Sequence, residues 1–196
     1  GSRASSVWWT YTAPSSGLVT IDTFGSAFDT VLAVYTGNTV GALTLVNSND
    51  DTAPGSRSKV AFAATGGQRY RIAVDGRNAN TGAIKLNWKH AASPANDNLA
   101  DAWVVAGANG ATGGSTNGAT RETGEPMHRH RGFASVWWSW TAPSTGNLRL
   151  STSGSNFDTV LSVYTGTDAG AAVARAQNDD DPTSYTSEVL VPVKAG

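Results

Sequence analysis

One passage occurs twice in this chain, and the duplication restricts the folds that the chain can adopt. The segment 6–9 (SVWW) returns as 135–138, and the segment 28–32 (FDTVL) returns as 157–161. The offset is 129 residues over a shared passage of 67 residues, without a gap. A period of this length indicates two related modules in tandem rather than a solenoid of short repeats. Residues that recur are therefore those that the module itself requires.

Short runs of alternating apolar and polar residues fill each copy. In the run 59–64, for example, Val60, Phe62 and Ala64 alternate with residues that suit an exposed face, as in a strand with one buried face. Turn residues such as the proline and glycine in 13–17 separate the runs, and no stretch has a helical period. Strands are expected over 7–12, 18–24, 30–35, 43–48, 59–64, 69–75 and 103–106, with a further one through Ile84, Leu86 and Trp88. The predicted fold is all-β, with two jelly-roll-like antiparallel β-sandwich modules.

Both modules are predicted to be partial. A full module would have a head like 96–131, a body like 6–67 and a tail like 68–88; the first copy lacks the head and the second lacks the tail. We expect a first module over 1–89, a linker over 90–95 and a second module over 96–196. Either the chain is a fragment of a longer array, or strands of another chain complete the sandwiches, because an incomplete sandwich exposes unpaired backbone.

The bulk composition excludes several classes of partner and site. A net charge of −1 gives no electrostatic footprint for nucleic acid, and no apolar run is long enough to span a membrane. The absence of cysteine excludes disulfides and thiolate metal sites. The 22 glycines and 15% charged residues suit an exported all-β protein.

Six stretches together resemble the repeated modules related to the bacterial pre-peptidase C-terminal domain (PPC-like). These stretches are 70–76, 96–102, 119–128, 135–143, 154–161 and 178–180. The resemblance implies a jelly-roll-like sandwich, often calcium-binding, that is appended to exported hydrolases or repeated along surface proteins. Relatives include collagen-binding modules. An extracellular or cell-surface location in a bacterium is therefore expected.

Two acidic loops are candidate calcium sites, because calcium prefers hard oxygen ligands on loops. Each loop follows an expected strand, and one further aspartate stands at the start of a neighbouring strand. The candidate ligands are Asp29, Asn49, Asp50, Asp51, Asp158, Asn178, Asp179 and Asp180. The alternative is that these side chains only cap turns through bonds to the backbone.

The segment 96–131 contains two further candidate metal sites. Asp97, Glu122 and Glu125 form a second acidic group, and His128 and His130 have the spacing of a zinc pair in an extended strand. No third zinc ligand is evident.

The paired tryptophans are candidate binding residues. Alternation places Val7, Trp9 and Tyr11 on one apolar face, expected to be core, and Trp8 on the other face. In the second copy Trp138 is expected in the core and Trp137 opposite it. Trp8 and Trp137 could form an aromatic platform for a sugar or a partner protein. Alternatively, they form a second packing layer.

No catalytic motif is recognisable, and a non-catalytic role is predicted. The first hypothesis is an extracellular binding or adhesion module, stabilised by calcium, that contacts a polysaccharide or a protein. The alternative is a structural subunit of an extracellular fibre or surface array, in which copies of the chain complete one another's sandwiches by strand complementation.

Overall fold

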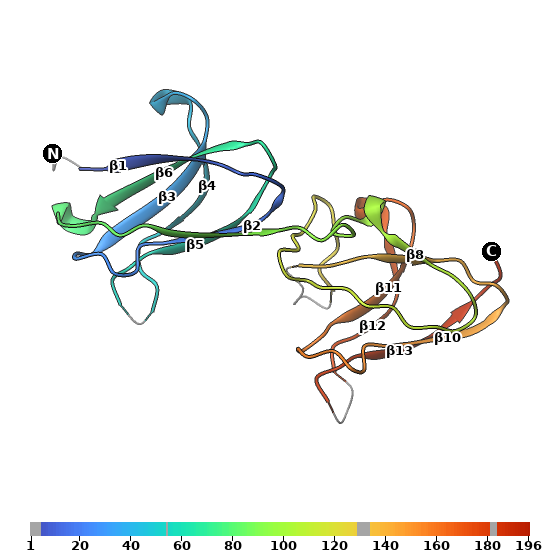
Figure 1. Cartoon of the computed structure of the whole chain (residues 1–196). Helices are drawn as coiled ribbons and strands as arrows, with labels where there is room; N and C mark the ends of the chain where they lie inside the picture. Colours follow the sequence, from blue (N-terminus) through green and yellow to red (C-terminus); the bar gives the residue numbers. More distant parts are fainter. Residues whose placement is uncertain (1–4, 54, 129–133, 181–183) are drawn as a thin grey trace. The chain divides into compact units, whose positions relative to one another are not determined.

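The computed structural model describes residues 5–53, 55–128, 134–180 and 184–196 (Figure 1). The chain divides into two compact units, Gly1–Ser93 (unit 1) and Pro94–Gly196 (unit 2). Regular structure in the described residues consists of strands and short 3₁₀ turns, which are η1 (Val40–Ala42), η2 (Arg77–Ala79), η3 (Leu99–Asp101) and η5 (Ala169–Ala171). The predicted all-β class is confirmed.

Unit 1 contains two antiparallel sheets. The four-stranded sheet has the order β1-β6-β3-β4, and the three-stranded sheet has the order β5-β2-β7. Their strands are β1 (Val7–Thr12), β2 (Gly17–Asp22), β3 (Thr30–Thr36), β4 (Thr44–Asn49), β5 (Lys59–Ala64), β6 (Arg69–Gly76) and β7 (Asn87–Ala92).

Alternate residues of both sheets form one core in unit 1. Val19 and Ile21 of β2 are fully buried, and they cluster with Leu32 of β3, Phe62 of β5 and Ile72 of β6. The strand β6 lies in the middle of its sheet, between β1 and β3, and is therefore central to the architecture of the unit.

The described part of unit 2 contains three strand pairs. The pairs β10-β13 and β11-β12 are antiparallel, and β8-β9 is parallel. The strands are β8 (Trp103–Val105), β9 (Trp138–Trp140), β10 (Gly146–Ser151), β11 (Leu161–Thr165), β12 (Val173–Asn178) and β13 (Glu188–Val193). At the offset of 129, β10 has the same bounds as β2, and β13 has the same bounds as β5.

The described strands of unit 2 include no counterpart of β6 or β7. Leu150 of β10 is accordingly 37% exposed, whereas Ile21 at the equivalent position of β2 is 0% exposed. Leu161 and Val163 of β11 are only half-buried. The apolar face that the described strands of unit 2 form is therefore partly open.

The last strand of unit 1 lies later in the chain than predicted. Strand β7 begins at Asn87, so Ile84 and Leu86 precede it, although both still pack against the core. Residues 90–92 of the expected linker belong to β7, because β2 offers them a pairing edge through to Gly17. The predicted linker over 90–95 is wrong in its first half.

Candidate functional site

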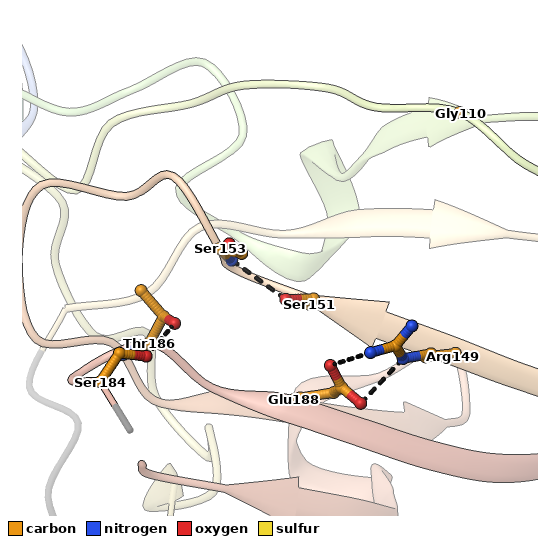
Figure 2. Close-up of a pocket in the computed structure, with 7 residues that line it drawn as sticks. All are labelled: Gly110, Arg149, Ser151, Ser153, Ser184, Thr186 and Glu188. Atoms are coloured by element: carbon orange, nitrogen blue, oxygen red, sulfur yellow. Dashed lines mark hydrogen bonds and ion pairs between the residues drawn. The ribbon is translucent and has the colours of Figure 1, made fainter. Parts of the chain in front are cut away.

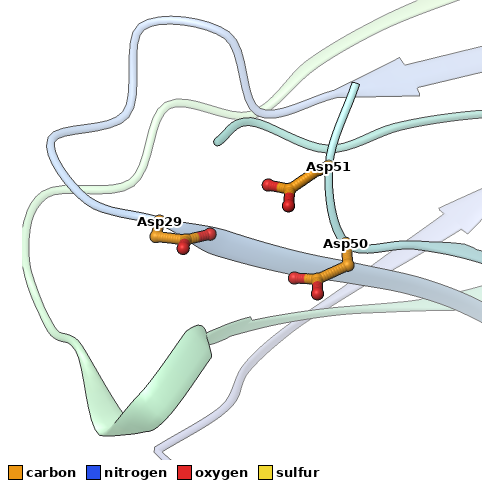
Figure 3. Close-up of side chains that lie close together, drawn as sticks. All are labelled: Asp29, Asp50 and Asp51. Carbon is orange, nitrogen blue, oxygen red and sulfur yellow. The ribbon is translucent and has the colours of Figure 1, made fainter. Parts of the chain in front are cut away.

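Three aspartates of unit 1 meet at one end of the four-stranded sheet. Asp29 directly precedes β3, and Asp50 and Asp51 directly follow β4. Because β3 and β4 are antiparallel neighbours, the start of one lies beside the end of the other. Each aspartate offers a carboxylate oxygen that lies within 4.8 Å of the others (Figure 3). The structure thus brings together three of the predicted ligands.

A buried hydroxyl network holds this acidic loop. Thr23 Oγ1 and Thr30 Oγ1 lie 2.6 Å apart, and the hydroxyl of the fully buried Ser58 donates to the Asp50 carbonyl at 2.7 Å. The same arrangement recurs in unit 2, at the same two distances, through Thr152, Thr159, Ser187 and Asp179. The loop is therefore fixed by polar contacts that both copies share.

Unit 2 contains an equivalent acidic cluster. Asp158, Asp179 and Asp180 also place carboxylate oxygens within 4.8 Å of one another. Two buried carboxylate oxygens of the first cluster, Asp29 Oδ1 and Asp50 Oδ1, accept no hydrogen bond, and neither does the buried Oδ1 of Asn178, the residue that precedes Asp179. A buried oxygen without a donor is unfavourable unless a cation compensates for it. This set of oxygen ligands therefore fits a hard divalent cation such as calcium.

An arginine that the sequence reasoning missed contacts the first cluster. Arg77 in η2 forms an ion pair with Asp50 and a second one with Asp51, at 3.3 Å between Nη1 and Oδ2. All three side chains are partly exposed, so the pairs are screened by water. Arg77 was missed because it belongs to the tail, far from Asp50 in sequence.

Asn49 caps the loop of the first cluster. Its Oδ1 accepts from Thr52 Oγ1 and from the Lys59 N–H, both at 3.1 Å. The capping alternative therefore describes the contacts of Asn49, and its role as a metal ligand stays a prediction.

The acidic residues of the segment 96–128, called the head from here on, do not form a metal site. Asp97 accepts from the Thr120 N–H and hydroxyl, at 2.7 and 2.8 Å, and Glu122 accepts from the Leu99 N–H at 2.7 Å. Each carboxylate therefore satisfies backbone and hydroxyl donors at a separate place.

Glu125 lies at the centre of a buried polar network. It accepts from His128 Nε2 at 2.9 Å, from the Glu122 N–H at 3.0 Å and from the Ser135 hydroxyl. Burial raises the pKa of Glu125, but these hydrogen bonds and the charge of His128 outweigh it, so the pKa is lowered. His128 Nδ1 lies 2.8 Å from the Tyr164 hydroxyl. The network thus fastens the head to the body of unit 2.

The two candidate binding tryptophans have different environments. Trp8 is 43% exposed, whereas Trp137 is 8% exposed beneath the head. The prediction of Trp137 as a surface platform is therefore wrong, because His128 packs on its ring with centroids 5.6 Å apart. The prediction that Trp138 is core is also wrong, since this side chain is exposed.

The remaining predicted zinc ligand, His130, lies outside the described residues. His128 is occupied by Glu125 and Tyr164, which leaves no support for a zinc pair in the part that the structure describes.

Unit 2 also has an open polar pocket of about 540 Å³ (Figure 2). Its floor includes an ion pair of Arg149 with Glu188, formed by two bonds of 2.7 and 2.8 Å. The remaining lining is Gly110, Ser151, Ser153, Ser184 and Thr186. Hydroxyl groups dominate this lining.

Comparison of the chain with known protein-family models and with curated proteins finds no match. Among the described residues, no helix is long and apolar enough to cross a membrane.

Proposed function

We propose that the protein is a non-catalytic binding or adhesion protein that works outside a bacterial cell or on its surface. In this proposal each unit is a jelly-roll-like β-sandwich of the PPC-like kind. Calcium stiffens the acidic loops, and the surfaces of the units contact a polysaccharide or a protein. The two-sheet core of unit 1 supports the sandwich part of the proposal.

The observation that carries the proposal is the duplicated acidic cluster. The same trio of aspartates comes together in both units, although unit 1 includes a tail segment and unit 2 includes the head. Like charges at such distances repel one another in the absence of a cation. In unit 1, calcium would bind to Asp29, Asp50 and Asp51. In unit 2, it would bind to Asp158, Asp179 and Asp180, with the Asn178 side chain as a further oxygen ligand. Calcium there would bridge segments that are far apart in sequence.

Thermal unfolding with and without calcium tests this proposal. A ligand that binds only the native state stabilises it by about 1.4 kcal/mol at ten times its dissociation constant, which raises the melting temperature by roughly 6–11 °C for units of this size. The double variant Asp29→Asn and Asp158→Asn should lose this response. Asp101→Asn is a matched control, because Asp101 lies outside both clusters. An unchanged melting temperature at millimolar calcium would refute the calcium sites.

A second candidate function is a structural subunit assembled by strand complementation. The open face of unit 2 favours it, because β11 pairs only with β12 among the described strands and Leu150 is exposed. Strands with the chemistry of β6 and β7 could pair there and cover the apolar side chains. Light scattering from 1 to 100 μM protein would show concentration-dependent oligomers. A single monomeric mass across that range would defeat this alternative.

A further inference from the structure

The outer edge of β1 in unit 1 is a sheet edge with a defined hydrogen-bonding direction. Among the described strands β1 pairs only with β6. The Ala13 N–H donates to the Gln68 carbonyl at 3.1 Å, so the odd-numbered residues of β1 point their backbone groups toward β6. Alternation in an antiparallel pair then directs the N–H and C=O of Trp8 away from β6, to the outer edge.

Exposed apolar side chains lie on this edge and in the turn η1 that follows β3. The ring of the exposed Trp8 packs on Tyr35, with centroids 5.8 Å apart, and Val40 is 84% exposed. The equivalent pair in unit 2, Trp137 and Tyr164, has the same centroid distance of 5.8 Å. There, however, Trp137 is buried, and Ala169 at the position of Val40 is 9% exposed. The two units share this surface but differ in whether it is covered.

The head covers the surface in unit 2. Its backbone binds the equivalent of Trp8 directly: the Trp137 N–H donates to the Asn96 carbonyl at 2.9 Å, and the Trp103 N–H donates to the Trp137 carbonyl at 3.1 Å. These bonds begin the parallel pairing of β8 with β9. The His128 ring then contacts the rings of Trp137 and Tyr164, both at 5.6 Å between centroids.

We propose that the outer edge of β1, together with Trp8, Tyr35 and Val40, binds a polypeptide segment with the sequence pattern of 96–128 as an added parallel strand. This inference rests on the proposed binding function and names its partner as protein. The serine whose hydroxyl donates to Glu125 in unit 2 also recurs, because Ser6 stands at the position of Ser135. In unit 1 its hydroxyl accepts from Trp8 Nε1 at 2.9 Å, an exposed bond that a docking carboxylate can replace.

The probe for this surface is a dye-labelled synthetic peptide of residues 96–128, titrated into the full chain and followed by fluorescence anisotropy. We expect saturable binding of one peptide per chain. Trp8→Ala should weaken it at least tenfold, and Val40→Glu should do the same. Trp88→Ala is the control, because Trp88 is also an exposed tryptophan but lies on β7 of the other sheet. Melting curves of each variant verify that it is folded.

Variants of the peptide test the mode of docking. His128→Ala in the peptide should weaken binding at least fivefold, because the imidazole contacts both aromatic rings in unit 2. Val104→Ala is the control, since this side chain faces solvent in unit 2. The head of unit 2 is tethered to its own site at a high effective concentration, so micromolar peptide does not displace it.

Three results would overturn the inference: no binding, equal binding to the Trp8 and Trp88 variants, or binding that Tyr164→Phe abolishes while Trp8→Ala leaves it intact. The same chain variants are titrated with soluble oligosaccharides. If an oligosaccharide binds through Trp8 and the peptide does not bind, the inference fails and the proposed binding function survives. If neither ligand binds, both fail.

Discussion

Neighbouring tryptophans exchange roles between the two units. In unit 1, Trp9 packs against the core and Trp8 is exposed. In unit 2 the head buries Trp137, the equivalent of Trp8, and Trp138 is 36% exposed. The residue type and the strand alternation are the same in both copies. The segment that packs against the strand therefore decides which ring is buried.

Replacement of each ring by alanine should reveal this exchange. Trp137→Ala is expected to destabilise the protein by about 3–5 kcal/mol, because it removes a buried aromatic ring. Trp138→Ala should lower stability by roughly 1 kcal/mol, since its ring is already partly hydrated. Urea unfolding followed by far-UV circular dichroism measures both values. Equal losses would contradict the packing described for unit 2.

Glu125 makes a pH-dependent contribution to stability. Its pKa is lowered in the folded protein, so its contribution is complete above the unfolded-state pKa of about 4.3 and is lost as the pH falls through the lower folded value. Glu125→Gln should therefore lower the free energy of unfolding by about 1–3 kcal/mol at pH 7. The difference from the unaltered protein should shrink below about pH 4.

Urea unfolding at several pH values measures this difference. Glu122→Gln is the control, because an amide oxygen can still accept from the Leu99 N–H, and its effect should be the smaller one. If the loss in free energy of unfolding caused by Glu125→Gln grew as the pH fell, the carboxylate would not be held in its charged form.

The tail elements of unit 1 alter the chemistry of its acidic cluster. η2 follows β6 and places the Arg77 guanidinium against Asp50 and Asp51. A guanidinium and a calcium ion compete for the same carboxylates, because both are cations that bind carboxylate oxygens. The first cluster should therefore bind calcium more weakly than its three carboxylates alone would.

Removal of this guanidinium tests the competition. Arg77→Gln should tighten calcium binding at the first cluster by about 1 kcal/mol, or roughly fivefold. Isothermal titration in the Asp158→Asn background measures the first cluster alone. Arg69→Gln, which removes an exposed arginine from the same tail, should leave the affinity unchanged. A weaker affinity on loss of Arg77 would mean that Arg77 orders the loop and does not compete with the ion.

The local sequence pattern predicted the bounds of the strands better than it predicted the burial of side chains. The bounds of β1 and β5 agree with prediction, because alternation and flanking turn residues are local signals. The carboxylate trio was also foreseeable, since Asp29 and Asp50 flank strands that are neighbours along the chain. The position of β7, the burial of Trp137 and the contact of Arg77 were not foreseeable. Each depends on a segment distant in sequence, which alternation does not encode.

At the scale of the whole molecule, the two units differ in how completely their strands are paired. β2 has partners on both edges, β5 and β7, whereas β10 pairs only with β13 in the described part of the chain. β2 also covers a closed core, and β10 leaves Leu150 partly hydrated. Backbone hydrogen bonds in strands with few buried contacts open more often. Unit 2 is thus expected to be the more dynamic unit.

Hydrogen exchange followed by mass spectrometry measures this difference directly. The segment 146–151 should exchange at least tenfold faster than 17–22, because β10 pairs with one described strand where β2 pairs with two, and because its apolar face is less covered. Strands β5 and β13 provide the matched comparison, since each pairs with one strand in its own unit. The ratio of the exchange rates of β13 and β5 reports the difference in core closure alone. It should be smaller than the ratio of the exchange rates of β10 and β2. Equal protection of β2 and β10 would mean that another part of unit 2 supplies the pairing that β7 gives to unit 1.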